Sequence, residues 1–117
     1  MPSWPEHDQR RSRRIRVNGE AEGTGIPLFK GSVINLSSGG VCVEHLEKLE
    51  SGQVCDLRFR IPPMTFAVRA HIAWSHPHGE GGGPPGGPRL FRSGAEFTDL
   101  SEDARAAIDF IVNRPPA

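Results

Sequence analysis

The chain has 117 residues, with 14 basic and 14 acidic side chains, so its formal net charge at pH 7 is zero. This length suits one domain with a single modest core. No apolar run is long enough to cross a bilayer, and the first residues lack the apolar segment of a signal peptide, so we expect a cytoplasmic protein without membrane insertion. Cys42 and Cys55 are too far apart for a CxxC motif and are expected to be small buried side chains.

The chain begins with residues 1–9, which predict a flexible tail because they hold two prolines, mixed charge and no periodicity. Five arginines follow within seven positions: Arg10, Arg11, Arg13, Arg14 and Arg16. On a neutral protein they form a local positive field that attracts an anion. Arginine can bind phosphate through two parallel hydrogen bonds and can stack on a base. A solvated basic arm or a nonspecific tether for nucleic acid would have the same composition.

From Ile15 onward, period-two alternation of apolar and polar residues predicts about six short strands. The first begins at Ile15, while 19–27 is either a ragged strand or a loop. The other strands are expected at 29–37, 41–46, 53–61, 66–75 and 89–98. In 66–75 the expected inward residues end with Ile72 and Trp74. In the last strand, Gly94 indicates a bulge or a close approach of another group.

The segment from His76 to Pro88 is rich in glycine and proline and predicts a mobile hairpin connection. Ser101 then caps a helix, whose first turn holds two acidic residues. Apolar residues at spacings of three and four give that helix one buried stripe: Ala104, Ala107, Ile108, Ile111 and Val112. Residues 115–117 form a short tail. Many strands followed by one helix favour a mainly β fold, a small closed antiparallel barrel with the helix over an opening or on its side.

A polar turn separates two of the predicted strands: Asn35-Leu36-Ser37-Ser38-Gly39-Gly40. As a simple hairpin turn, it would use Asn and Ser to bond nearby backbone and the glycines to allow positive φ. However, Asn35 and Ser37 are two positions apart and are expected on the face of Val33. Two short polar groups there can recognise the edge of a base, with a nearby arginine binding guanine.

Together the two segments resemble the PilZ domain, a bacterial receptor module for cyclic di-GMP. Its signature is RxxxR followed by (D/N)xSxxG. The first part is satisfied by Arg10-Arg11-Ser12-Arg13-Arg14, and the second by Asn35, Ser37 and Gly40 in its three fixed places. The stretches GVCVE, AHIAWS and SGAEFTDLSEDARAAIDFI are similar to the family's third strand, its tryptophan-bearing strand, and its final strand with helix. The resemblance covers residues 10–113.

The resemblance implies a six-stranded antiparallel β-barrel with a C-terminal α-helix, here over residues 10–114. It implies that Arg10 and Arg14 contact the phosphates and guanine of the ligand, with Arg11 as a helper. The barrel side of the same site would be lined by Asn35, Ser37 and Gly40. Residues 10–16 would form an arm that becomes ordered over the dianionic ligand, the entropic cost being offset by charge-assisted hydrogen bonds.

The expected function is therefore that of a stand-alone cyclic di-GMP receptor or adaptor, in which the ordered arm alters a surface for an unidentified protein effector. We expect no enzyme, since GxGxxG and P-loop patterns are missing and no nucleophile–base set is recognisable. No metal or other cofactor is expected, because the histidines at 71, 76 and 78 lack a cysteine or carboxylate pattern. Two alternatives remain: a ligand-free PilZ-type adaptor for proteins, and a small nucleic-acid-binding barrel. The second is disfavoured because most aromatic residues are expected inside.

Overall fold

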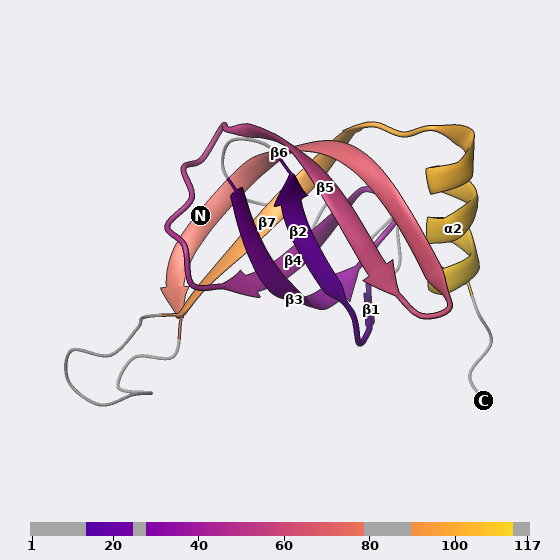
Figure 1. Cartoon of the computed structure of the whole chain (residues 1–117), viewed down its shortest axis with the longest axis horizontal. Helices are drawn as coiled ribbons and strands as arrows, with labels where there is room; N and C mark the ends of the chain where they lie inside the picture. The colour runs from indigo at the N-terminus through magenta and orange to yellow at the C-terminus, as the bar shows by residue number, and fades with distance from the viewer. Residues whose placement is uncertain (1–13, 25–27, 79–89, 114–117) are drawn as a thin grey trace.

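The computed structural model describes residues 14–24, 28–78 and 90–113, and in these ranges it contains seven strands and one helix (Figure 1). The expected tails at 1–9 and 115–117 lie outside the described residues, as do most of the arginine arm and of the glycine-rich segment. The elements in chain order are β1 (Ile15–Arg16), β2 (Glu20–Thr24), β3 (Leu28–Leu36), β4 (Gly40–His45), β5 (Val54–Ile61), β6 (Met64–His78), β7 (Leu90–Asp99) and α2 (Glu102–Val112).

Six of the strands close into a barrel in which every pairing is antiparallel. The hydrogen-bonded order is β3-β2-β5-β6-β7-β4, and a further pairing between β3 and β4 completes the circle. The short strand β1 pairs with the C-terminal end of β3, opposite Asn35 and Leu36. The predicted small antiparallel barrel with a C-terminal helix is therefore confirmed, with β1 as an extra strand.

The core fills the inside of this barrel, and β5 shows most clearly how the sequence builds it. Exposed and buried residues alternate along all of β5, so Leu57 and Phe59 point inward as expected from the period-two pattern. Phe59 is fully buried and packs against Phe66 and Phe97, with ring centroids 5.1 and 6.2 Å away. Burying each such ring stabilises the fold by about 1.5–3 kcal/mol.

The helix α2 stands at one end of the barrel, beside β6 (Figure 1). Ser101 caps it, since its Oγ accepts a hydrogen bond from the backbone N–H of Ala104 at 3.1 Å. The buried residues of the helix are the five predicted for its apolar stripe. Within the described ranges, no helix is both long enough and apolar enough to span a membrane.

The expected orientation of Asn35 is wrong, because a bulge in β3 shifts the alternation. Val33 pairs with Val43, whereas Asn35 pairs with Cys42, so Ile34 is the extra residue. Neighbouring residues on β4 point to opposite faces, and directly paired residues share a face. Asn35 therefore points outward, away from the face of Val33, and Leu36 takes the next core position.

The expected inward orientation of Trp74 is also wrong, for the same kind of reason. In β6, Ile72 pairs with Ala95 of β7, and Trp74 pairs with the preceding Gly94. Ala73 is thus bulged, and Trp74 moves to the outer face of the barrel while Ile72 stays in the core. Strand β6 also continues through His78, three residues into the segment where a loop was expected.

Candidate functional site

A continuous row of paired residues crosses the outside of the barrel and takes one residue from each of five strands. Cross-strand pairing links Arg16 of β1 to Asn35, Asn35 to Cys42, Cys42 to Gly94, and Gly94 to Trp74. Residues opposite each other in a ladder share a face, so these five lie side by side. We call them the outer row. It joins Asn35 of the second sequence motif to four residues that lie outside both motifs.

Arg14 immediately precedes β1 and binds the outer row directly. Its Nη1 donates a hydrogen bond to Oδ1 of Asn35 at 2.8 Å, and both side chains are partly buried. The structure therefore brings together one residue from each predicted motif. Since the carbonyl oxygen of Asn35 accepts this bond, the side chain has its amide N–H groups left to act as donors. Arg10 and Arg11 lie outside the described residues.

Ser37 lies next to the outer row, but its hydroxyl is used within the turn. The side chain is 1% exposed, and its Oγ accepts hydrogen bonds from the backbone N–H groups of Gly39 and Gly40, each at 3.2 Å. The backbone N–H of Ser37 also donates to the carbonyl of Gly40 at 2.9 Å. Ser37 thus fixes the path from β3 into β4, and Gly40 is buried beside it.

The expected reason for the two glycines in this turn is wrong. Among the residues that the structure describes, only Gly52 has a positive φ, of 91°. The turn at Gly39 and Gly40 is instead closed by the Ser37 hydroxyl, and the carbonyl of Gly39 accepts a hydrogen bond from the N–H of Phe97 at 3.0 Å. The turn is therefore attached to β7 as well as to the strands it connects.

Trp74 forms an aromatic surface at the far end of the outer row. A Cβ placed on Gly94 would lie 2.4 Å from Nε1 of Trp74, so the indole rests directly on the glycine. The ring of His76 stacks beside the indole, with centroids 5.4 Å apart and an angle of 18° between the planes. The close approach predicted at Gly94 is confirmed. Sequence reasoning nevertheless missed Trp74 as a site residue, although a glycine within a strand was the available signal.

The pKa of Cys42, in the middle of the row, shows which charges lie near it. Burial raises the pKa of its thiol, while Arg92 and then Arg14 lower it and Glu44 raises it by smaller amounts. The thiol is thus held in its protonated form and acts as a small apolar residue. Two guanidinium groups from distant parts of the chain, before β1 and in β7, act on this one atom. Positive charge therefore converges on the outer row.

A hollow of about 400 Å³ lies beside the outer row. Arg16 and Arg92 contribute to its wall, and the bulged Ile34 contributes apolar surface. Sequence reasoning had assigned Arg16 to the general positive field and had not selected Arg92. A guanidinium pair, a partly buried amide and an indole ring are together suited to an anion that carries an aromatic base.

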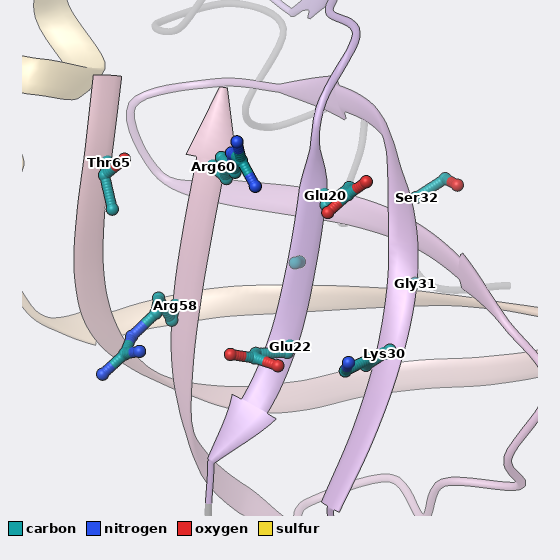
Figure 2. A pocket seen from close by; sticks show the side chains of 9 residues that line it. Glu20, Glu22, Lys30, Gly31, Ser32, Arg58, Arg60 and Thr65 are labelled. Atoms are coloured by element: carbon teal, nitrogen blue, oxygen red, sulfur yellow. The ribbon is translucent and has the colours of Figure 1, made fainter. Parts of the chain in front are cut away.

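A larger hollow, of about 700 Å³, lies over a different part of the barrel wall, on the outer faces of β2, β3 and β5 with Thr65 of β6 (Figure 2). We call this the charged wall. Figure 2 shows Glu20 and Glu22 on the central strand, between Lys30 on one side and Arg58 and Arg60 on the other. The charges alternate in sign across the strands, and none of the described residues that line the hollow is aromatic. The described residues contain no cluster of three His, Cys, Asp or Glu side chains that could hold a metal ion.

Comparison with known proteins identifies a family model that matches most of the chain. The family model of the PilZ domain matches residues 8–114. No curated protein matches the sequence. Among solved structures, the chain is similar to the PilZ domain of Escherichia coli YcgR with cyclic di-GMP, with a TM-score of 0.70 and 14% identity over 90% of this chain and 89% of that one.

Two longer solved proteins share the same fold. The Bacillus subtilis inhibitor of motility MotI has a TM-score of 0.70 and 16% identity, with 91% of this chain covered. The complex of E. coli YcgR with cyclic di-GMP has a TM-score of 0.68 and 15% identity, with 90% covered. The matches span 50% of the MotI chain and 45% of the YcgR chain, so this chain corresponds to about half of each.

Proposed function

Because the chain belongs to the PilZ family, we propose that it is a receptor for cyclic di-GMP, which it binds over the outer row. The hydrogen bond between Arg14 and Asn35 is the main support for this proposal, since it joins the two motif segments on one exposed face. The PilZ domain of E. coli YcgR, which has the same fold, was solved with cyclic di-GMP.

Each group on this face has a role that its chemistry suits. The Arg14 guanidinium binds a phosphate or the guanine O6 and N7, and the Asn35 amide donates to the same ligand. The stacked rings of Trp74 and His76 form an aromatic surface against which a guanine can pack. Ser37 and Gly40 act one step removed, by fixing the turn that presents Asn35.

We further propose that binding is converted into a signal by the arginine arm at 10–16, of which Arg14 and Arg16 are already held against Asn35. Arg10 and Arg11 complete the ligand site when the arm becomes ordered, and the new surface is presented to a protein effector. The charge-assisted hydrogen bonds, at about 1.5–3 kcal/mol each, offset the entropy lost by the arm. On this proposal the protein works as an adaptor, and no step requires catalysis or a metal.

Calorimetric titration of the purified chain with cyclic di-GMP tests the proposal, with GTP and cyclic di-AMP as controls. We expect saturable binding of cyclic di-GMP and at least tenfold weaker binding of the two controls, since neither presents two guanines on a cyclic phosphate backbone. A folded protein that does not bind cyclic di-GMP would contradict the receptor function and leave the protein-adaptor alternative.

The outward position of Trp74 favours a second candidate, binding of single-stranded nucleic acid. Sequence reasoning had disfavoured this function because the aromatic residues were expected inside, and Trp74 removes part of that objection. A gel shift with single-stranded DNA that weakens with salt, and is unchanged by Asn35→Ala, would support it. If the shift does not occur, or if cyclic di-GMP competes for the same face, the receptor function is favoured.

A further inference from the structure

We propose that the ion pair between Arg92 and Glu44 tunes ligand affinity: Arg92 supplies an anion contact from the barrel wall, and Glu44 restrains Arg92 and lowers the affinity. This inference rests on the proposed function, because it concerns the same ligand on the same face. It adds two residues that lie outside both sequence motifs. It also predicts that one substitution tightens binding.

The register places the Arg92–Glu44 pair directly beside the outer row. Glu44 and Arg92 are cross-strand partners, and each lies two positions along its strand from the Cys42–Gly94 pair. Positions two apart share a face and are separated by about 6.6 Å along a strand. The same ladder continues from Arg92 to His76, whose ring stacks on Trp74. The pair thus lies on the ligand-facing side of the barrel, one step from the row.

The contact leaves Arg92 able to bind a second anion. Its Nε lies 3.1 Å from Oε2 of Glu44, and the two side chains are 34% and 25% exposed. Guanidinium groups carry several N–H donors in a planar fork, so one contact with a carboxylate leaves donors for a phosphate. Partial burial reduces screening by solvent, so the charges act more strongly here than on an open surface.

Two further observations place Arg92 in the same site as Arg14. Both guanidinium groups lower the pKa of Cys42, which lies in the outer row on β4. Arg92 also lines the 400 Å³ hollow together with Arg16 and the bulged Ile34. A ligand that lies across the outer row is therefore flanked by Arg14 on one side and by Arg92 on the other. Glu44 is then a carboxylate close to a dianion, which repels it.

The test compares cyclic di-GMP affinities of the full chain and the variants Arg92→Ala, Arg92→Lys and Glu44→Gln, by calorimetry at two ionic strengths. We expect Arg92→Ala to bind about tenfold more weakly, because one charge-assisted contact is lost. Arg92→Lys should lie between, since the charge remains but the planar fork does not. Glu44→Gln should bind about threefold to tenfold more tightly, since a repulsive charge is removed. The affinity of Arg92→Ala should also depend less on salt.

The pair of Asp56 and Arg69 is a matched control. It also joins neighbouring strands, with Nε of Arg69 3.1 Å from Oδ1 of Asp56, but it lies on β5 and β6 away from the outer row. Asp56→Asn and Arg69→Ala should leave affinity within about twofold of the unchanged protein, as expected for an exposed pair outside the site. Thermal unfolding of every variant checks that the fold is retained.

The outcomes separate this inference from the proposed function. If the unchanged protein does not bind cyclic di-GMP, the proposed function fails, and this inference fails with it. If it binds and Arg92→Ala binds equally well, the inference alone is overturned. If Glu44→Gln binds equally or more weakly, the restraining role of Glu44 is overturned, since a merely structural ion pair would lose affinity when broken. Damage to the fold cannot produce tighter binding.

Discussion

Two parts of the same barrel wall, the outer row and the charged wall, differ in a way that shows what makes a binding site. The charged wall has the larger hollow, about 700 against 400 Å³, and five ionisable side chains line it. By volume and number of charges it would be chosen first. Yet its acidic residues lie on the central strand, and the strands on both sides carry basic residues. The sign of the charge therefore alternates from strand to strand. An anion approaching it meets attraction and repulsion together.

The outer row has fewer charges, but they converge on short polar and aromatic groups. Arg14 is fixed on Asn35, and the indole of Trp74 lies flat where Gly94 leaves space. Groups held in place lose little entropy when a ligand binds, whereas long exposed side chains must be ordered first. Exposed charges are also screened by solvent and salt. Fixed orientation, more than charge or volume, therefore distinguishes the candidate site.

The largest effect is expected for an arginine beside the outer row, and an arginine of the charged wall serves for comparison. Arg14→Ala should weaken cyclic di-GMP binding by about tenfold to a hundredfold or more, because a partly buried, charge-assisted contact is lost. Arg58→Ala on the charged wall should leave the affinity within about twofold. Calorimetry on the two variants measures both. Near-unchanged affinity for Arg14→Ala, or an equal loss of affinity for Arg58→Ala, would remove the distinction between the outer row and the charged wall.

Ser37 and Ser32 provide a comparison of stability. Ser37→Ala removes a buried acceptor for the N–H groups of Gly39 and Gly40 and should lower the free energy of unfolding by about 1–3 kcal/mol. Ser32 is exposed on the charged wall, and Ser32→Ala should change the free energy of unfolding by less than about 0.5 kcal/mol. Urea denaturation measures both values. Equal losses would mean that the turn does not depend on the Ser37 hydroxyl.

Gly94 gives a smaller effect, which tests the aromatic part of the outer row. Gly94→Ala places a methyl group where the indole of Trp74 lies, so the ring must move and binding should weaken by about fivefold to tenfold. In a Trp4→Phe background, Trp74 is the only tryptophan, and its emission should shift to longer wavelength as the ring becomes more exposed. Ala67→Val, at an exposed position of β6, should change neither signal. Unchanged binding despite a shifted emission would exclude stacking on Trp74.

Regular periodicity made much of the fold predictable. Alternation in β5 and the stripe of α2 identified core residues correctly, because each element there is regular and has one dry face. The structure also places Arg14 and Asn35, one residue from each motif, in contact. Those predictions depend on short-range patterns and on a recognised pair of motifs, both of which are visible in a single sequence.

Bulges account for the two residues whose orientation was predicted wrongly. A period-two pattern assumes that every residue is paired. The extra residues Ile34 and Ala73 break this pattern, so the faces predicted for Asn35 and Trp74 were wrong. Arg92 was missed for another reason. Its proximity to Cys42 and the hollow arises from the pairing of β4 with β7, which are far apart in the sequence. Neighbours across a closed barrel are set by its closure, which no local pattern specifies.

The smallest effect concerns His45, which lies inside the barrel and belongs to neither the outer row nor the charged wall. Its Nε2 lies 2.7 Å from Oγ of Ser93, and its ring packs near Phe29 and Phe91. Burial lowers the pKa of His45 from 6.5, opposed by smaller effects of Glu47 and Glu44. Below pH 6.5 the unfolded chain takes up a proton that the folded chain still excludes, so the free energy of unfolding should fall as pH decreases from 6.5 through the lower, folded-state pKa.

Replacing His45 by phenylalanine tests this contribution directly. His45→Phe keeps an aromatic ring beside Phe29 and should remove the part of the decline that begins near pH 6.5. That part amounts to at most about 1.4 kcal/mol per pH unit for one proton. His76→Gln, on the exposed ring beside Trp74, should retain the decline. If His45→Phe keeps the whole decline, the buried imidazole is not its source, whereas a decline that disappears with His45 belongs to a group inside the barrel and leaves the charge of the outer row unchanged.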